Sequence, residues 1–165
     1  MKRLVRTIVA GTFLFASSAM ADLFPGSLWL TNDFAAGSPL LNTTKSGTVL
    51  RTIPNVAADG LAVIGNDLYV NSTGFGGNKY DLDTLAVDGT FSLPHSSEDM
   101  AEAGGFIYSG DFFGDAIDKV DPATGTRVGG FSVGFQPLGL TSDGSGGFWV
   151  SEFASGSDSP FRWIG

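Results

Sequence analysis

The sequence predicts an all-β fold built from repeated four-stranded antiparallel units, and three observations carry this prediction. Glycine accounts for 24 of the 165 residues while charged residues make up only 16%, a composition that suits short strands and tight turns better than long helices. An aromatic-centred apolar triplet recurs at a nearly constant interval. Turn residues stand at matching places around these triplets. A small sheet repeated along one chain accounts for all three observations.

The first 21 residues have the organisation of a secretory signal peptide. Basic residues precede an apolar stretch at 7–16, and the segment ends in Ala19-Met20-Ala21, a small-residue pattern that signal peptidases accept. The stretch is about half as long as a bilayer-crossing helix, which argues against a membrane anchor. We therefore expect residues 1–21 to be removed and residues 22–165 to form a secreted or periplasmic domain without a membrane span.

The chain is acidic and contains no cysteine. Nine Lys and Arg residues stand against 17 Asp and Glu residues, which gives a formal net charge of -8. This balance disfavours nucleic acid as a partner, because few cations are present to neutralise phosphates. The absence of cysteine excludes a disulfide framework, a thiolate metal site and a cysteine nucleophile.

Four aromatic triplets define the repeat. Their central aromatic residues lie 40, 39 and 41 residues apart. In the last three units a short apolar segment and a tight turn precede the triplet, so these units begin with a β-hairpin, whereas the first unit lacks this opening strand. The triplets are Leu28-Trp29-Leu30, Leu68-Tyr69-Val70, Ile107-Tyr108-Ser109 and Phe148-Trp149-Val150.

In each of the first three units, two further strands are expected after the triplet. In the third unit they cover 115–120 and 127–133, separated by the turn Asp121-Pro122-Ala123-Thr124-Gly125. Four strands in about 40 residues make one blade of a β-propeller, and a β-sandwich or an irregular barrel is the alternative. The corresponding segments of the first and second units are 39–42, 48–53, 79–83 and 90–93.

The expected domain is short for a closed propeller. At about 40 residues per blade, residues 22–165 hold about 3.6 blades, whereas closed propellers have about four to eight. The fourth unit stops at 161–165, where its third strand is expected. We therefore expect a partial or truncated β-propeller. A ring closed by a second copy and an open arc are the alternatives, and open blade edges and flanks favour self-association.

The third and fourth units resemble the blades of known propeller families. The turn at 121–125, which follows Ile117-Asp118-Lys119-Val120, resembles the strand, turn and strand of YVTN-type and streptogramin-lyase-type propellers. The segment 137–152 resembles the first hairpin of those blades and of gluconolactonase-like ones. Because this blade serves lyases, lactonases and plain binding proteins, the resemblance implies the architecture and leaves the activity open.

Acidic residues follow the second strand in three of the four units. Asp33, Asp111 and Glu152 lie three or four residues after the central aromatic residue. Propeller ligands sit over the central channel, so we expect these residues to form a shared ligand site, with Asp59 and Asp99 from the blade-to-blade loops. Asp33, Asp111 and Glu152 suit a hard divalent cation such as Ca²⁺ or Mg²⁺, although aspartates at strand ends also cap turns.

Other polar residues are interpreted structurally. His95 is the only histidine, and its polar surroundings after Pro94 favour a solvated loop residue over a general base. No Gly-x-Ser-x-Gly elbow supports a Ser-His-Asp arrangement. The aspartates between Asp111 and Asp121 are interpreted as solvated edges and turn anchors, and the segment 74–77 (Gly-Phe-Gly-Gly) as a flexible surface loop.

These observations favour a secreted propeller-type module that binds a protein or a small-molecule ligand through one loop face, with no catalytic activity evident. The first alternative is a metal-assisted hydrolase or lactonase of the gluconolactonase-like kind, which needs the cation to polarise an ester carbonyl and activate water. The second is a truncated remnant without independent activity.

Overall fold

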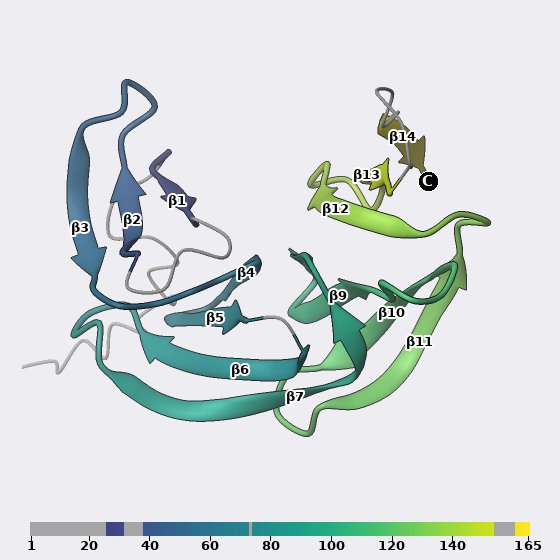
Figure 1. Cartoon of the computed structure of the whole chain (residues 1–165), viewed down its shortest axis with the longest axis horizontal. Helices are drawn as coiled ribbons and strands as arrows, with labels where there is room; N and C mark the ends of the chain where they lie inside the picture. Colours follow the sequence, from purple (N-terminus) through teal and green to yellow (C-terminus); the bar gives the residue numbers. More distant parts are fainter. Residues whose placement is uncertain (1–25, 32–37, 73, 154–160) are drawn as a thin grey trace, which may run out of the picture.

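The computed structural model describes residues 26–31, 38–72, 74–153 and 161–165. Within these residues the chain forms 14 strands in four antiparallel sheets and no helix (Figure 1). Accordingly, the described part of the chain has no helix with the length and apolar character needed to span a membrane. The predicted signal peptide lies outside the described residues. The all-β prediction is confirmed.

Four sheets follow one another along the chain, each with strands in sequence order. Sheet A contains β1 (Leu28–Leu30), β2 (Leu40–Thr43) and β3 (Val49–Ile53). Sheet B contains β4 (Gly60–Ile64), β5 (Asp67–Asn71), β6 (Gly74–Asp81) and β7 (Val87–Ser97). Sheet C contains β8 (Met100–Ala103), β9 (Phe106–Gly110), β10 (Ala116–Asp121) and β11 (Thr126–Ser132). Sheet D contains β12 (Pro137–Ser142), β13 (Phe148–Glu152) and β14 (Phe161–Ile164).

The sheets are arranged as blades along an arc (Figure 1). The opening strands β4, β8 and β12 lie on the inside of the arc, where β8 contacts both of the others. The closing strands β3, β7 and β11 lie on its outside. Each aromatic triplet forms the second strand of such a blade, or the edge strand β1 in sheet A. The 40-residue repeat therefore corresponds to one sheet.

Apolar clusters fill the space between consecutive sheets. Fully burying one large apolar side chain contributes about 1.5–3 kcal/mol, so these clusters hold the blades together. Phe91 and Phe148 belong to these clusters. Between sheets A and B lie Leu40, Ile53, Leu68 and Val70; between B and C lie Tyr69, Phe91, Met100 and Ile107; between C and D lie Ala101, Ile117, Leu140 and Phe148.

The glycine-rich segment at 74–77 is part of strand β6, so the prediction of a flexible loop was wrong. A Cβ at Gly76 would overlap the carbonyl oxygen of Phe91, and one at Gly77 would overlap that of Val70. Glycine is needed here because the neighbouring backbones come too close for any side chain.

Strand β7 leads into the next blade through an irregular pairing. Gly74 pairs with Ser97 and Gly76 pairs with Ser92, so residues 93–96 form a bulge opposite a single residue of β6. This bulge contains His95, and it is the feature that brings the histidine to sheet C.

Candidate functional site

A hollow of about 410 Å³, named here the acidic hollow, lies beside the starts of β4 and β8. Asp59 and Asp99, which precede β4 and β8, contribute its carboxylates. Its volume lies within the range of small-molecule sites. The lining residues are Trp29, Leu30, Thr31, Asp59, Leu61, Asp99, Met100, Leu140 and Thr141.

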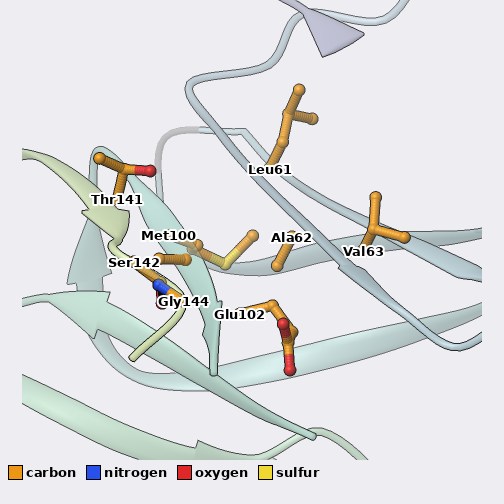
Figure 2. Close-up of a pocket in the computed structure, with 9 residues that line it drawn as sticks. Leu61, Ala62, Val63, Met100, Glu102, Thr141, Ser142 and Gly144 are labelled. Atoms are coloured by element: carbon orange, nitrogen blue, oxygen red, sulfur yellow. Dashed lines mark hydrogen bonds between the residues drawn. The ribbon is translucent and has the colours of Figure 1, made fainter. Parts of the chain in front are cut away.

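A second hollow of about 410 Å³, the turn-side hollow, lies toward the other end of the inner strands (Figure 2). Leu61, Met100 and Thr141 line both hollows, so the two adjoin on the inside of the arc. The carboxylate of its lining belongs to Glu102, whose Oε1 accepts a hydrogen bond of 2.9 Å from the Gly105 N–H. The turn-side hollow is therefore the less acidic of the two.

Asp99 is held firmly at the acidic hollow by backbone donors. Its Oδ1 accepts the N–H of Met100 at 2.8 Å, and its Oδ2 accepts the N–H of Leu140 at 2.8 Å. The carboxylate thus connects β8 of one blade to β12 of the next. Burial raises the pKa of Asp99 to about 6, although both backbone donors favour its ionised form.

Asp59 and Glu98 add negative charge near Asp99. The backbone N–H of Asp59 donates to the Asn71 carbonyl at 2.9 Å, which fixes the start of sheet B. Burial raises the pKa of Glu98, and the charge of Asp59 raises it further. The acidic hollow therefore favours a cationic ligand or one that donates hydrogen bonds.

Asp111 and Glu152 do not line the acidic hollow and have local partners. Asp111 Oδ1 accepts the N–H of Phe113 at 3.2 Å within its own turn, and Glu152 Oε2 accepts a hydrogen bond of 2.7 Å from Arg162 Nη2. Asp33 lies outside the described residues. In the described ranges no three acidic or histidine side chains are grouped to hold a metal. The cation site that includes Asp33 stays a prediction.

A polar cluster joins the β7 bulge to sheet C. His95 Nδ1 lies 3.1 Å from Asp118 Oδ2, and His95 Nε2 lies 3.1 Å from Ser109 Oγ. Asp118 Oδ1 also accepts a hydrogen bond of 2.6 Å from Arg127 Nε. Asp118 and Ser109 are buried and His95 is largely covered. The interpretation of His95 and Asp118 as solvated residues was therefore wrong.

The cluster has the order of a Ser-His-Asp relay, but its position does not suit hydrolysis. A nucleophile must reach a substrate carbonyl, whereas Ser109 is completely buried and lines neither hollow. The hydrogen bonds instead satisfy polar groups between two blades. We interpret His95, Ser109 and Asp118 as a structural link.

Solved structures with a similar fold identify the architecture as that of the β-propellers. Glutaminyl cyclase of Myxococcus xanthus matches with a TM-score of 0.62 and 19% identity over 75% of this chain and 62% of that one. A luciferin-regenerating enzyme matches with a TM-score of 0.56 and 17% identity over 77% and 50%. The Pan2 WD40 domain of Neurospora crassa, a β-propeller, matches with a TM-score of 0.55 and 11% identity over 83% and 45%.

These similarities define the fold of the chain and leave its activity open. The chain spans between 45% and 62% of the length of the three structures. No protein-family model matches the sequence, and no curated protein matches it. One blade architecture supports many unrelated functions, so function has to be argued from the site.

Proposed function

We propose that the chain is a secreted propeller-type binding module that takes a small-molecule ligand in the acidic hollow. The observation that carries this proposal is the convergence of Asp59 and Asp99 on one hollow of about 410 Å³. Export rests on the signal-like segment at 1–21. N-terminal sequencing of the exported protein tests it, since cleavage after Ala21 leaves Asp22 as the first residue.

The lining of the acidic hollow favours a ligand with a cationic head and an apolar body. Asp59 and Asp99 attract the cationic head of the ligand, and Leu61 and Met100 contribute apolar lining beside its body. The Arg51 guanidinium lies 5.3 Å from the centroid of the Trp29 ring, which orients this aromatic wall. An aromatic primary amine has this combination of features.

The comparisons support a propeller without choosing between binding and catalysis. Two of the similar structures are named as enzymes and one as a WD40 domain. The blade motifs at 117–125 and 137–152 support a relationship to YVTN, streptogramin-lyase or gluconolactonase-like propellers as part of this proposal. We favour binding over catalysis because Ser109 of the His95–Ser109–Asp118 cluster is buried, whereas the acidic hollow is open to ligands.

Fluorescence of Trp29 tests ligand binding directly. The variant Trp149→Phe/Trp163→Phe keeps Trp29 as its single tryptophan. We expect benzylamine to change its emission saturably and benzyl alcohol to bind at least about tenfold more weakly, because only the amine carries a charge for the carboxylates. Asp99→Asn and Asp59→Asn should each weaken benzylamine binding, whereas Asp121→Asn, at the end of β10 and outside the lining of the hollow, should not. Equal binding of the amine by all of these proteins would contradict the proposal.

Addition of Ca²⁺ or Mg²⁺ to the unaltered protein tests the hydrolase alternative. If Asp33, Asp111 and Glu152 hold a cation, its addition raises the melting temperature, and Asp111→Ala or Glu152→Ala abolishes that rise. A binding module without a metal site shows no such rise. Loss of the Arg162 ion pair in Glu152→Ala should by itself cost less than about 1 kcal/mol, because this pair is solvent-exposed.

A further inference from the structure

The three interfaces between consecutive blades use the same positions of the aromatic triplets. Side chains alternate between the two faces of a strand, so the residues on either side of the central aromatic point to the face opposite to it. In β5, Leu68 and Val70 pack in the cluster shared with sheet A. In β13, Phe148 and Val150 pack in the cluster shared with sheet C. These flanking positions therefore face the preceding blade.

The central aromatic residue faces the following blade. Tyr69 of sheet B belongs to the cluster that includes Met100 and Ile107 of sheet C. The ring centroid of Tyr108 in sheet C lies 4.5 Å from that of Phe148 in sheet D. Each internal interface thus combines the central aromatic of one blade with the flanking positions of the next, which are apolar except for Ser109.

The two end blades expose the two unmatched halves of this interface. Leu28 and Leu30 of β1 are 45% and 44% exposed, whereas the corresponding Leu68 and Val70 are 0% and 3% exposed. At the other end, Trp149 of β13 is 47% exposed, whereas the corresponding Tyr69 is 6% exposed. Among the described residues, no further blade covers the preceding-blade face of sheet A or the following-blade face of sheet D.

The uncovered face of sheet D is a broad aromatic surface. Trp149 pairs directly with Trp163 across β13 and β14, so both indoles lie on the same face of the sheet. Trp163 is 53% exposed, and its Nε1 donates to Asp143 Oδ2 at 3.0 Å, which fixes the ring in place. This ordered pair of rings is the kind of apolar patch that marks a protein contact.

We propose that two copies of this chain associate with sheet D of each copy packed on sheet A of the other. The contact would repeat the A–B, B–C and C–D interfaces of the chain, with Trp149 and Trp163 covering Leu28 and Leu30 of the partner. Sheets A and D lie at the two ends of the arc (Figure 1). The two contacts of such a pair are equivalent and are related by a two-fold axis.

The mass of the purified chain in solution tests this association. Light scattering after size exclusion should give twice the mass of one chain at micromolar concentration. Trp149→Asp and Leu30→Asp should each give the mass of one chain, because each places an uncompensated charge in the contact. Val87→Asp, at an exposed apolar residue on the outer strand of sheet B, should keep the double mass. Circular dichroism identifies variants that have lost the fold.

Mixing two complementary variants tests whether sheet D of one copy contacts sheet A of the other. Single substitutions do not show which two faces meet. Trp149→Asp and Leu30→Lys should each be single chains alone and should form a pair when mixed, because one contact then joins Asp to Lys and the other is native. A single-chain mass for the unaltered protein would overturn the proposal. So would a pair that persists in both Asp variants, or an open series of larger species.

Discussion

The links that enter sheets B and C have the same spacing and opposite chemistry. Each begins with an aliphatic residue followed by proline and ends in aspartate, over 53–59 and 93–99. In the first link Val56 packs against the apolar cluster between sheets A and B. In the second link His95 occupies a polar cluster with Ser109 and Asp118.

The difference shows that one kind of blade interface can be closed in two ways. At the matching position of the second strand, sheet B buries Val70 where sheet C buries Ser109. Apolar packing is non-directional and loses stability in proportion to the area removed. A buried hydrogen-bond network fixes direction, but loss of one member leaves its partners unsatisfied. The interface between B and C should therefore be the more sensitive to single substitutions.

Among the substitutions that test this comparison, removal of the Asp118 side chain should reduce the free energy of unfolding most. Asp118→Ala leaves His95 without its Nδ1 partner and Arg127 without its ion pair, so we expect a loss of about 3–4 kcal/mol in the free energy of unfolding. Asn78, the exposed residue at the matching position of β6, provides the control, and Asn78→Ala should change stability by less than about 0.5 kcal/mol. Urea unfolding measures both. Equal losses would show that the polar interface has no special sensitivity.

Asp99, the last residue of the second link, should make the free energy of unfolding depend on pH. The folded pKa of Asp99 is about 6, above the ordinary value of 3.8, so the native state binds more protons than the unfolded state between these values. The free energy of unfolding should therefore fall as pH rises from about 4 to about 6, by about 3 kcal/mol, and stay level above that range.

Asp99→Asn should remove this slope in urea unfolding measured from pH 4 to pH 7. The matched control is Asp143→Asn, because hydrogen bonds from Trp163 and Ser145 lower the pKa of Asp143 to about 2. Its contribution is lost only as pH falls toward 2, so the slope between pH 4 and pH 6 should remain. An unchanged slope in Asp99→Asn would assign the effect to other carboxyl groups.

Replacing the histidine itself should have the smallest of the three effects. His95→Ala removes two hydrogen bonds but leaves Asp118 its bond from Arg127, and we expect a loss of about 1–2 kcal/mol. The matching residue of the first link, Asn55, has a φ of 58°, and Asn55→Gly should be close to neutral because glycine adopts this conformation readily. Thermal unfolding of both variants compares the links. A larger loss in Asn55→Gly would reverse the comparison.

The strand order and blade size were predictable because they depend on local signals. Triplets centred on Tyr69 or Tyr108 and turns such as 121–125 fix strands within about 40 residues, and the structure has strands at these places. Asp59 and Asp99 each precede an inner strand of this repeat and line one hollow, whereas the full five-residue site with Asp33, Asp111 and Glu152 stays a prediction.

The polar cluster and the role of the glycines were not predictable from such signals. His95 and Asp118 are 23 positions apart and meet only because residues 93–96 bulge out of sheet B. Gly76 and Gly77 have the appearance of a loop, and only the approach of neighbouring backbones explains them. The ion pair that occupies Glu152 likewise depends on the register of β13 and β14.

The linear order of the sheets has a consequence for how the chain loses its structure. Sheets B and C have a neighbour on each side, whereas sheets A and D each have one within the described residues. In a single, unassociated chain, backbone amides of β5 and β9 should therefore exchange with solvent deuterium most slowly, and those of β1 and β14 most rapidly. Local opening begins at the two termini of such an array and moves inward, so the central sheets govern global unfolding.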